Sequence, residues 1–160
     1  MEKELLEILR KNCRLSCEEM AVMLGTTADA VRDTMESLEE KGIIVGYNAL
    51  IDWEKLDNQY VTAYIEVRVT PQRGQGYDKV AERIYKFPQV SACSLISGGF
   101  DLFVVVEGKT MKEVALFVAE KLAPIDSVIS CATHFVLRKY KDNGVVFNKV
   151  QKDDREAVVL

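Results

Sequence analysis

The chain has 160 residues, of which 48% are apolar and 29% are charged, and its formal net charge is −4. This length suits one average domain or two small ones, and the apolar share excludes a chain that is disordered throughout. No uninterrupted apolar stretch approaches the roughly 18 residues of a membrane span, and Met1-Glu2-Lys3-Glu4 does not resemble the start of a signal peptide. We therefore expect a cytoplasmic protein.

The first 25 residues predict two helices. In the first helix, one stripe is apolar and the other faces are charged; the stripe consists of Leu5, Leu6, Ile8 and Leu9. Ser16 is a typical residue to begin the second helix, and Glu19 stands three positions later, as a capping box requires. Gly25 is typical of the end of a helix.

A third helix follows after a very short turn. Thr26-Thr27 supplies its amino-terminal cap, and its apolar positions have helical spacing: Val31, Met35 and Leu38. Two short helices separated by a glycine turn, the second opened by a threonine cap, predict a helix-turn-helix. After Gly42, the run Ile43–Tyr47 predicts a short β-element that would serve as a wing or as a linker strand.

From Tyr60 onward the apolar period changes to two, and the predicted elements follow the order β-α-β-β-α-β. The ranges of these six elements are 60–69, 77–87, 90–96, 100–107, 110–124 and 128–140. This order is the ferredoxin-like arrangement, so the fold class is α+β. We divide the chain into a helix-turn-helix domain (1–50), a linker (51–59), a ferredoxin-like domain (60–147) and a tail (148–160).

The cysteines and the single histidine do not form a pattern that is typical of a metal-binding or catalytic site. Cys13, Cys17, Cys93 and Cys131 include no CxxC pair, and His134 is the only histidine. We expect reduced cysteines packed as small apolar groups, with a metal role as the weaker alternative. Since a phosphate-binding loop and a dinucleotide motif are also missing, we expect neither an enzyme nor a cofactor.

Two sets of motifs resemble those of Lrp/AsnC-type transcriptional regulators. The first set is similar to the helix-turn-helix of that family: Leu24–Thr27, Val31-Arg32 and Leu38–Tyr47. The second set is similar to its effector domain: Phe87–Val90, Ser97–Leu102 and Thr133–Leu137, leading into Lys139-Tyr140-Lys141. The resemblance covers residues 3–147. It implies a dimer, often assembled into octamers, that binds DNA and responds to a small effector, usually an amino acid.

The third helix, where the resemblance implies DNA recognition, has an acidic outer face. At about 100° per residue, the side opposite the apolar stripe carries Asp29, Asp33, Glu36 and Glu40. Arg32 is its only basic residue, and residues 1–55 hold seven basic and twelve acidic side chains, a net charge of −5. Carboxylates facing phosphates weaken DNA binding.

We therefore predict weak or partner-assisted contacts with double-stranded DNA. The residues expected to make them are Arg14, Thr26, Thr27, Asp29, Arg32 and Asp33. The alternative is a sensor or protein-interaction module whose helix-turn-helix no longer binds DNA strongly.

The predicted effector site is the loop between the second and third strands. The residues expected to bind the effector are Ser97, Gly98, Gly99, Phe100, Asp101 and Thr133. Glycines let the backbone approach a carboxylate closely, and Asp101 could pair with an ammonium group. The simpler alternative is a tight hairpin turn whose backbone is hydrogen-bonded by Asp101. Because Thr133 and His134 point to opposite faces of their strand, at most one can line such a site.

The predicted sheet is apolar on both faces, as in the run Leu102–Val106. One face of a ferredoxin-like sheet packs on its two helices. The other face must be covered by something else, most simply by a second copy of the chain. We therefore expect a homodimer or a larger assembly.

Overall fold

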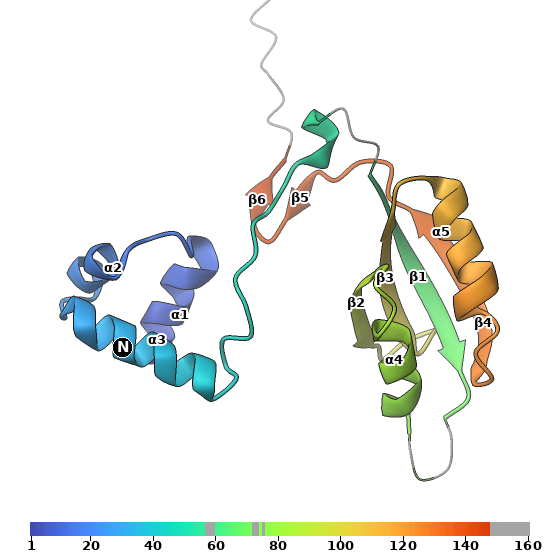
Figure 1. Cartoon of the computed structure of the whole chain (residues 1–160), viewed down its shortest axis with the longest axis horizontal. Helices are drawn as coiled ribbons and strands as arrows, with labels where there is room; N and C mark the ends of the chain where they lie inside the picture. Colours follow the sequence, from blue (N-terminus) through green and yellow to red (C-terminus); the bar gives the residue numbers. More distant parts are fainter. Residues whose placement is uncertain (57–59, 72–73, 75, 148–160) are drawn as a thin grey trace, which may run out of the picture. The chain divides into compact units, whose positions relative to one another are not determined.

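The computed structural model describes residues 1–56, 60–71, 74 and 76–147. The predicted tail, 148–160, and the end of the predicted linker, 57–59, lie outside the described residues. The chain forms two compact units, Met1–Leu50 and Ile51–Leu160 (Figure 1), and each is described by itself. In the described part of the chain, no helix combines the length and the apolar content needed to cross a bilayer.

The first unit contains three helices, as predicted. They are α1 (Glu2–Lys11), α2 (Cys17–Leu24) and α3 (Ala28–Glu40). Their apolar stripes meet in one core, whose buried members are Leu5, Leu9, Met20, Ala21, Val31 and Leu38. Burying such side chains stabilises the unit by about 1.5–3 kcal/mol for each large aliphatic group.

Local hydrogen bonds set the boundaries of α2 and α3. The hydroxyl oxygen of Ser16 accepts from the Glu19 amide at 3.2 Å, and the Glu19 carboxylate accepts from the Ser16 amide at 2.8 Å. The predicted capping box is therefore confirmed. Gly25 ends α2 in the left-handed conformation, with φ at 66°, and Thr27 Oγ1 then accepts from the Ala30 amide at 3.2 Å to begin α3. These contacts produce the short turn between the two helices.

Replacing the cap of α2 should weaken the first unit measurably. In Ser16→Ala the Glu19 amide loses its acceptor, so we expect the free energy of unfolding to fall by about 1 kcal/mol. Denaturant unfolding followed by circular dichroism measures the change. Ser16→Asp is the matched control, because it keeps an acceptor at the same position and should remain close to the native value. Equal losses in both variants would contradict a capping role.

The prediction of a short β-element at residues 43–47 is wrong. Both Ile43 and Ile44 donate their amides to the Leu38 carbonyl, at 2.9 and 3.1 Å, and so complete the end of α3. The chain then runs on without a strand partner among the described residues, and a strand needs a neighbouring ladder to satisfy its backbone. Tyr47 returns to α3 instead, where its hydroxyl donates to the Glu39 carboxylate at 2.7 Å.

The second unit has the predicted ferredoxin-like order of elements. Its antiparallel sheet contains β1 (Val61–Val69), β2 (Val90–Leu95), β3 (Leu102–Gly108) and β4 (Val128–Phe135), in the spatial order β2-β3-β1-β4. The helices are α4 (Asp78–Tyr85) and α5 (Met111–Phe117), the latter continued by a π-helical segment, η2 (Val118–Leu122). A short 3₁₀ turn, η1 (Trp53–Lys55), precedes the sheet.

Both helices cover the same face of the sheet (Figure 1). That face presents alternate residues of the two central strands: Ala63, Ile65, Val67, Val69, Leu102, Val104 and Val106, all buried. Val80 and Ile84 of α4 and Val114 and Phe117 of α5 complete the core. The residues that alternate with them therefore point to the opposite face, which neither α4 nor α5 covers.

The last strand is shorter than the predicted 128–140. β4 ends at Phe135, which lies opposite Ala63, and the Val136 amide donates to the Thr62 carbonyl at 2.9 Å. Because β1 begins at Val61, the following residues have no further partner on that strand. The chain instead forms a small hairpin of β5 (Lys141–Asp142) and β6 (Val145–Val146), with Asn143 and Gly144 at φ values of 44° and 83°. Positive φ at both turn positions is typical of a two-residue hairpin.

The cap of α5 differs in part from the predicted capping box. Thr110 Oγ1 accepts from the Glu113 amide at 3.0 Å, as expected. The Glu113 carboxylate, however, accepts from the Lys109 amide at 2.9 Å rather than from Thr110. Of the two hydrogen bonds in a capping box, only the one from the Glu113 amide to Thr110 Oγ1 therefore forms between these residues.

Candidate functional site

The outer face of α3 is acidic, as the sequence predicts. Asp29, Asp33, Glu36 and Glu40 are all exposed. Arg32 is also exposed, but its Nη1 lies 2.6 Å from Asp29 Oδ1 one turn earlier. The hydrogen bond and charge of Asp29 raise the pKa of Arg32. The only cation of this helix is therefore paired with a carboxylate of the same helix, which leaves less of its charge for a phosphate.

The remaining predicted DNA contacts are divided between two segments. Thr26 and Thr27 lie in the turn before α3, where Thr27 Oγ1 is already used as the helix cap. Arg14 is exposed in the turn before α2, where its amide donates to Asn12 Oδ1 at 3.1 Å. One residue was missed: the charge of Glu18, on α2, acts on Arg32 as well. Sequence periodicity within one helix could not have indicated this electrostatic effect of one helix on another.

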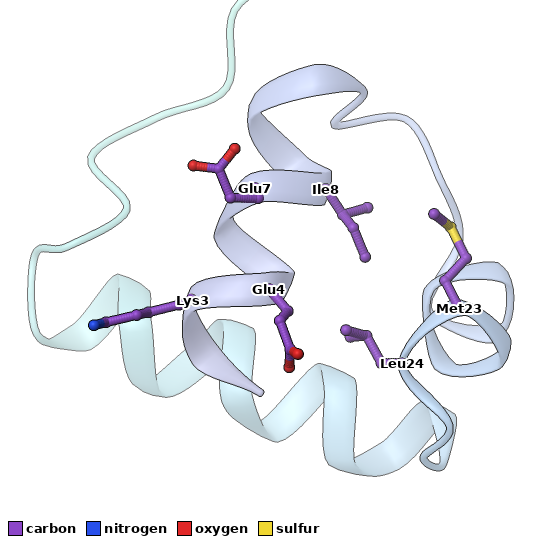
Figure 2. Close-up of a pocket in the computed structure, with 6 residues that line it drawn as sticks. All are labelled: Lys3, Glu4, Glu7, Ile8, Met23 and Leu24. Atoms are coloured by element: carbon purple, nitrogen blue, oxygen red, sulfur yellow. The ribbon is translucent and has the colours of Figure 1, made fainter.

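A groove lies between α1 and α2, away from the predicted DNA contacts (Figure 2). Its volume is about 410 Å³, and it is lined by Lys3, Glu4, Glu7, Ile8, Met23 and Leu24. Figure 2 shows Ile8, Met23 and Leu24 pointing into the space between the two helices, while Glu7 points away. The groove is thus apolar inside and charged along the α1 side.

The loop at residues 97–101, predicted to bind the effector, is held against the end of β1. The Ile96 amide donates to the Asp101 carbonyl at 2.8 Å, and the Asp101 amide donates to the Val67 carbonyl at 3.1 Å. Asp101 Oδ2 accepts from the Val69 amide at 2.9 Å. Asp101 therefore binds backbone, as the simpler alternative expected, although it binds β1 rather than the turn itself.

Thr133 is not brought beside this loop within one chain. In the ladder between β1 and β4, Thr133 lies opposite Ile65, on the face that the helices cover. His134 lies opposite Tyr64, on the uncovered face. The two side chains thus occupy opposite faces, as predicted. β1 stands between Thr133 on β4 and the loop that precedes β3.

The uncovered face of the sheet has an apolar centre with charge beside it. Tyr64 and Phe103 place their ring centres 5.3 Å apart, and Phe100 lies 6.3 Å from Phe103. Next to them, His134 Nε2 lies 3.5 Å from Glu66 Oε1. This face combines aromatic surface, which favours association, with a polar histidine–carboxylate contact that favours a defined orientation.

The cysteines are free, and only one departs from its predicted environment. Cys93 and Cys131 pack against the core of the second unit, and burial raises the pKa of both thiols. Cys17 packs against the core of the first unit, whereas Cys13 is exposed, so its predicted packing is wrong. Within the residues that the structure describes, no three His, Cys, Asp or Glu side chains are grouped to hold a metal ion.

Two protein-family models match the chain, one in each unit. Residues 1–45 match a winged helix-turn-helix DNA-binding family, and residues 62–146 match the Lrp/AsnC ligand binding domain. The two matches leave residues 46–61 and 147–160 uncovered.

Several known proteins are similar over nearly the whole chain. The uncharacterized HTH-type transcriptional regulator YugG of Bacillus subtilis is 48% identical over 99% of this chain and 95% of its own length. The HTH-type transcriptional regulator LrpA of Pyrococcus horikoshii is 33% identical over 88% of this chain and 96% of its own. The crystal structure of the transcriptional regulator NMB0573 from Neisseria meningitidis, in complex with L-Met, has a TM-score of 0.70. It is 23% identical and covers 92% of this chain and 95% of that one, which shows a shared fold.

Proposed function

Because this chain belongs to the Lrp/AsnC family of transcriptional regulators, we propose that it acts in the cytoplasm as a homodimer, or as an octamer built from such dimers, that binds operator DNA and senses an amino acid. The observation that carries this proposal is the match of both family models, in order, to the two units of the structure. The first unit supplies a helix-turn-helix with an exposed third helix. The second supplies a ligand-binding domain with an uncovered apolar sheet face.

DNA binding by α3 is proposed to be weak in an isolated unit and to become useful when several units act together. Arg32 is paired with Asp29, and the neighbouring exposed residues of α3 are largely acidic. Phosphate neutralisation supplies much of the affinity for DNA, so a single α3 is a poor binder. Linking two or more units raises the effective concentration of the second contact and offsets this weakness.

A gel-shift experiment on the full-length protein tests this function. DNA from upstream of the protein's own reading frame should be retarded at low salt more strongly than random DNA of equal length, and an amino acid effector should change the retardation. If cognate and random DNA behave alike at all salt concentrations, the alternative gains support. That alternative, favoured by the acidic surface of α3, is a sensor that controls a partner protein.

The proposed effector site is the loop at residues 97–101, completed by Thr133 of a second copy. Gly98 and Gly99 are exposed, and their missing side chains allow a ligand to approach the backbone. Asp101 Oδ2 is used by Val69, while Oδ1 accepts no hydrogen bond from the described residues and could pair with an ammonium group. The complex of the Neisseria relative with L-Met supports an amino acid as the ligand class.

Two substitutions at Asp101 should separate binding from folding. Asp101→Asn keeps an acceptor for the Val69 amide but removes the charge, so we expect a normal melting temperature and effector binding weaker by about tenfold or more. Asp101→Ala leaves that amide without its partner and should also lower the free energy of unfolding by about 1–3 kcal/mol. Isothermal titration calorimetry with L-Met, paired with thermal unfolding, measures both effects. Unchanged L-Met affinity in Asp101→Asn would remove Asp101 from the site.

A further inference from the structure

A second cavity lies in the second unit, away from the loop at residues 97–101. It has a volume of about 70 Å³ and lies between the segment that follows Leu50, the start of β1 and the chain beyond β4. Its lining includes three charged side chains, Asp52, Glu54 and Lys139, and three aromatic rings, Trp53, Tyr60 and Phe147. None of the residues predicted to bind DNA or the effector lines this cavity.

Asp52 lines the cavity, and one of its carboxylate oxygens has incomplete hydrogen bonding. Asp52 Oδ2 is buried and accepts no hydrogen bond from the described residues. Lys55 Nζ lies 3.2 Å from it and forms an ion pair, and the Lys55 side chain is 70% exposed. Buried polar atoms in folded proteins nearly always have a hydrogen-bond partner. A donor from a bound ligand would complete the bonding of Asp52.

A cationic residue, Lys139, lines the cavity from the chain beyond β4. Lys139 Nζ donates to Asp142 Oδ2 at 2.9 Å and lies 5.7 Å from the centre of the Phe147 ring. An ammonium group has three donors, so the bond to Asp142 leaves capacity for another acceptor. The cavity is therefore lined by carboxylate residues on one segment and by a lysine on another, the combination of charges that a small zwitterion requires.

Aromatic rings complete the wall, and they are held in place without a ligand. Trp53 and Tyr60 are stacked, with ring centres 5.2 Å apart and an interplanar angle of 28°. The Tyr60 hydroxyl donates to Glu107 Oε2 at 2.7 Å, which anchors the ring to β3. This hydrogen bond, together with burial, raises the pKa of Tyr60 to about 12, so the hydroxyl keeps its proton. Aromatic faces attract an ammonium group by cation–π interaction.

We propose that this cavity binds a small α-amino acid as a zwitterion, with its ammonium group on Asp52 and its carboxylate on Lys139. The small volume favours glycine, alanine or serine over larger side chains. The site is separate from the loop at residues 97–101 and does not depend on it. Its ligand would join the segment that directly follows the helix-turn-helix unit in the sequence to the chain leaving β4, so its occupancy would stiffen that linker.

Trp53 is the only tryptophan in the chain, so its fluorescence reports on this cavity. We expect titration of the full-length protein with L-alanine to give a saturable change in tryptophan emission. Ethylamine and propionate, which each carry one of the two charges, should bind about tenfold or more weakly than L-alanine. Because these probes act on the native protein, this comparison needs no variant to fold.

Variants then identify the residues. Asp52→Asn and Lys139→Gln should each weaken L-alanine binding by about tenfold or more, whereas Asp126→Asn, an exposed carboxylate outside the cavity, should leave it unchanged. Asp101→Asn should also retain the Trp53 titration, which distinguishes this site from the proposed effector loop. The inference is overturned if L-alanine gives no saturable change, if either single-charge probe binds as well as L-alanine, or if Asp52→Asn titrates like the native protein.

Discussion

Phe103→Asp should convert the protein from a dimer into a monomer. Phe103 lies near the centre of the uncovered sheet face, with the rings of Tyr64 and Phe100 beside it. In the proposed dimer, the new carboxylate would be buried without a partner, which costs several kcal/mol. The dissociation constant of the dimer should therefore rise by about a thousandfold, equivalent to about 4 kcal/mol. Light scattering at micromolar concentration measures the change.

The control places the same charge on the helix side of the domain. Met111 is half-exposed at the start of α5, so Met111→Asp should remain dimeric. Far-ultraviolet circular dichroism should show native secondary structure in both variants, because neither position is buried within one chain. A Phe103→Asp protein that stays dimeric, or a native protein that is monomeric at this concentration, would show that the uncovered face is not the interface.

Dissociation of the dimer should also abolish detectable DNA binding. Each α3 has one arginine, which is paired with a carboxylate, so a single unit should bind DNA only weakly. When two units are held together by the sheet interface, binding of the first to DNA keeps the second close to its own site. This raises the affinity of the pair, and the increase disappears when the interface is lost. Because α3 alone should bind DNA weakly, DNA binding should depend on the assembly that the uncovered sheet face forms.

The features that the sequence predicted well depend on residues close together in the chain. The cap of α2 by Ser16 and Glu19 needs contacts only three residues apart, and Gly25 needs only its own φ. The alternation of β1 and β3 is likewise local, and it determined both the buried face and the uncovered one. These signals are strong because few competing structures satisfy the same backbone groups.

The predictions that failed depend on where a distant partner ends. Val128–Tyr140 alternates well enough for a strand, but β4 stops at Phe135 because β1 has no residues left to pair with it. In the same way, Ile43 and Ile44 have strand-forming side chains, yet their amides are taken by the Leu38 carbonyl. Strand propensity describes a suitable surface and does not supply the neighbouring strand.

The candidate sites differ in how far the sequence could indicate them. The acidic face of α3 follows from helical geometry alone. The ion pair of Arg32 with Asp29 also depends on the conformations of both side chains, which the sequence does not give. The cavity at Asp52 and Lys139 was not predicted, because these two residues of its wall are 87 positions apart in the chain. The one usable signal was the clustering of Trp53 and Tyr60 beside charged residues in the linker.

Asp29→Asn should make the protein bind DNA more tightly. The substitution removes the charged partner of Arg32 and one carboxylate from the outer face of α3, while Thr27 keeps its capping bond to the Ala30 amide. A freed arginine can contact a phosphate, and one additional contact steepens the slope of log affinity against log salt by about 0.9. We expect affinity for upstream DNA to rise about three- to tenfold at low salt. Fluorescence anisotropy across a salt series measures both quantities.

Glu7→Gln is the matched control, because Glu7 forms the same kind of ion pair, with Arg10 at 2.8 Å on α1, and its loss changes the net charge equally. If the two variants gain equally, the effect comes from overall charge and α3 has no special position on DNA. If only Asp29→Asn gains, and Arg32→Ala reverses that gain, the arginine of α3 is the contact. If neither variant changes affinity, the acidic helix does not face DNA. The helix-turn-helix then serves a protein partner, for which its exposed carboxylates are the better match.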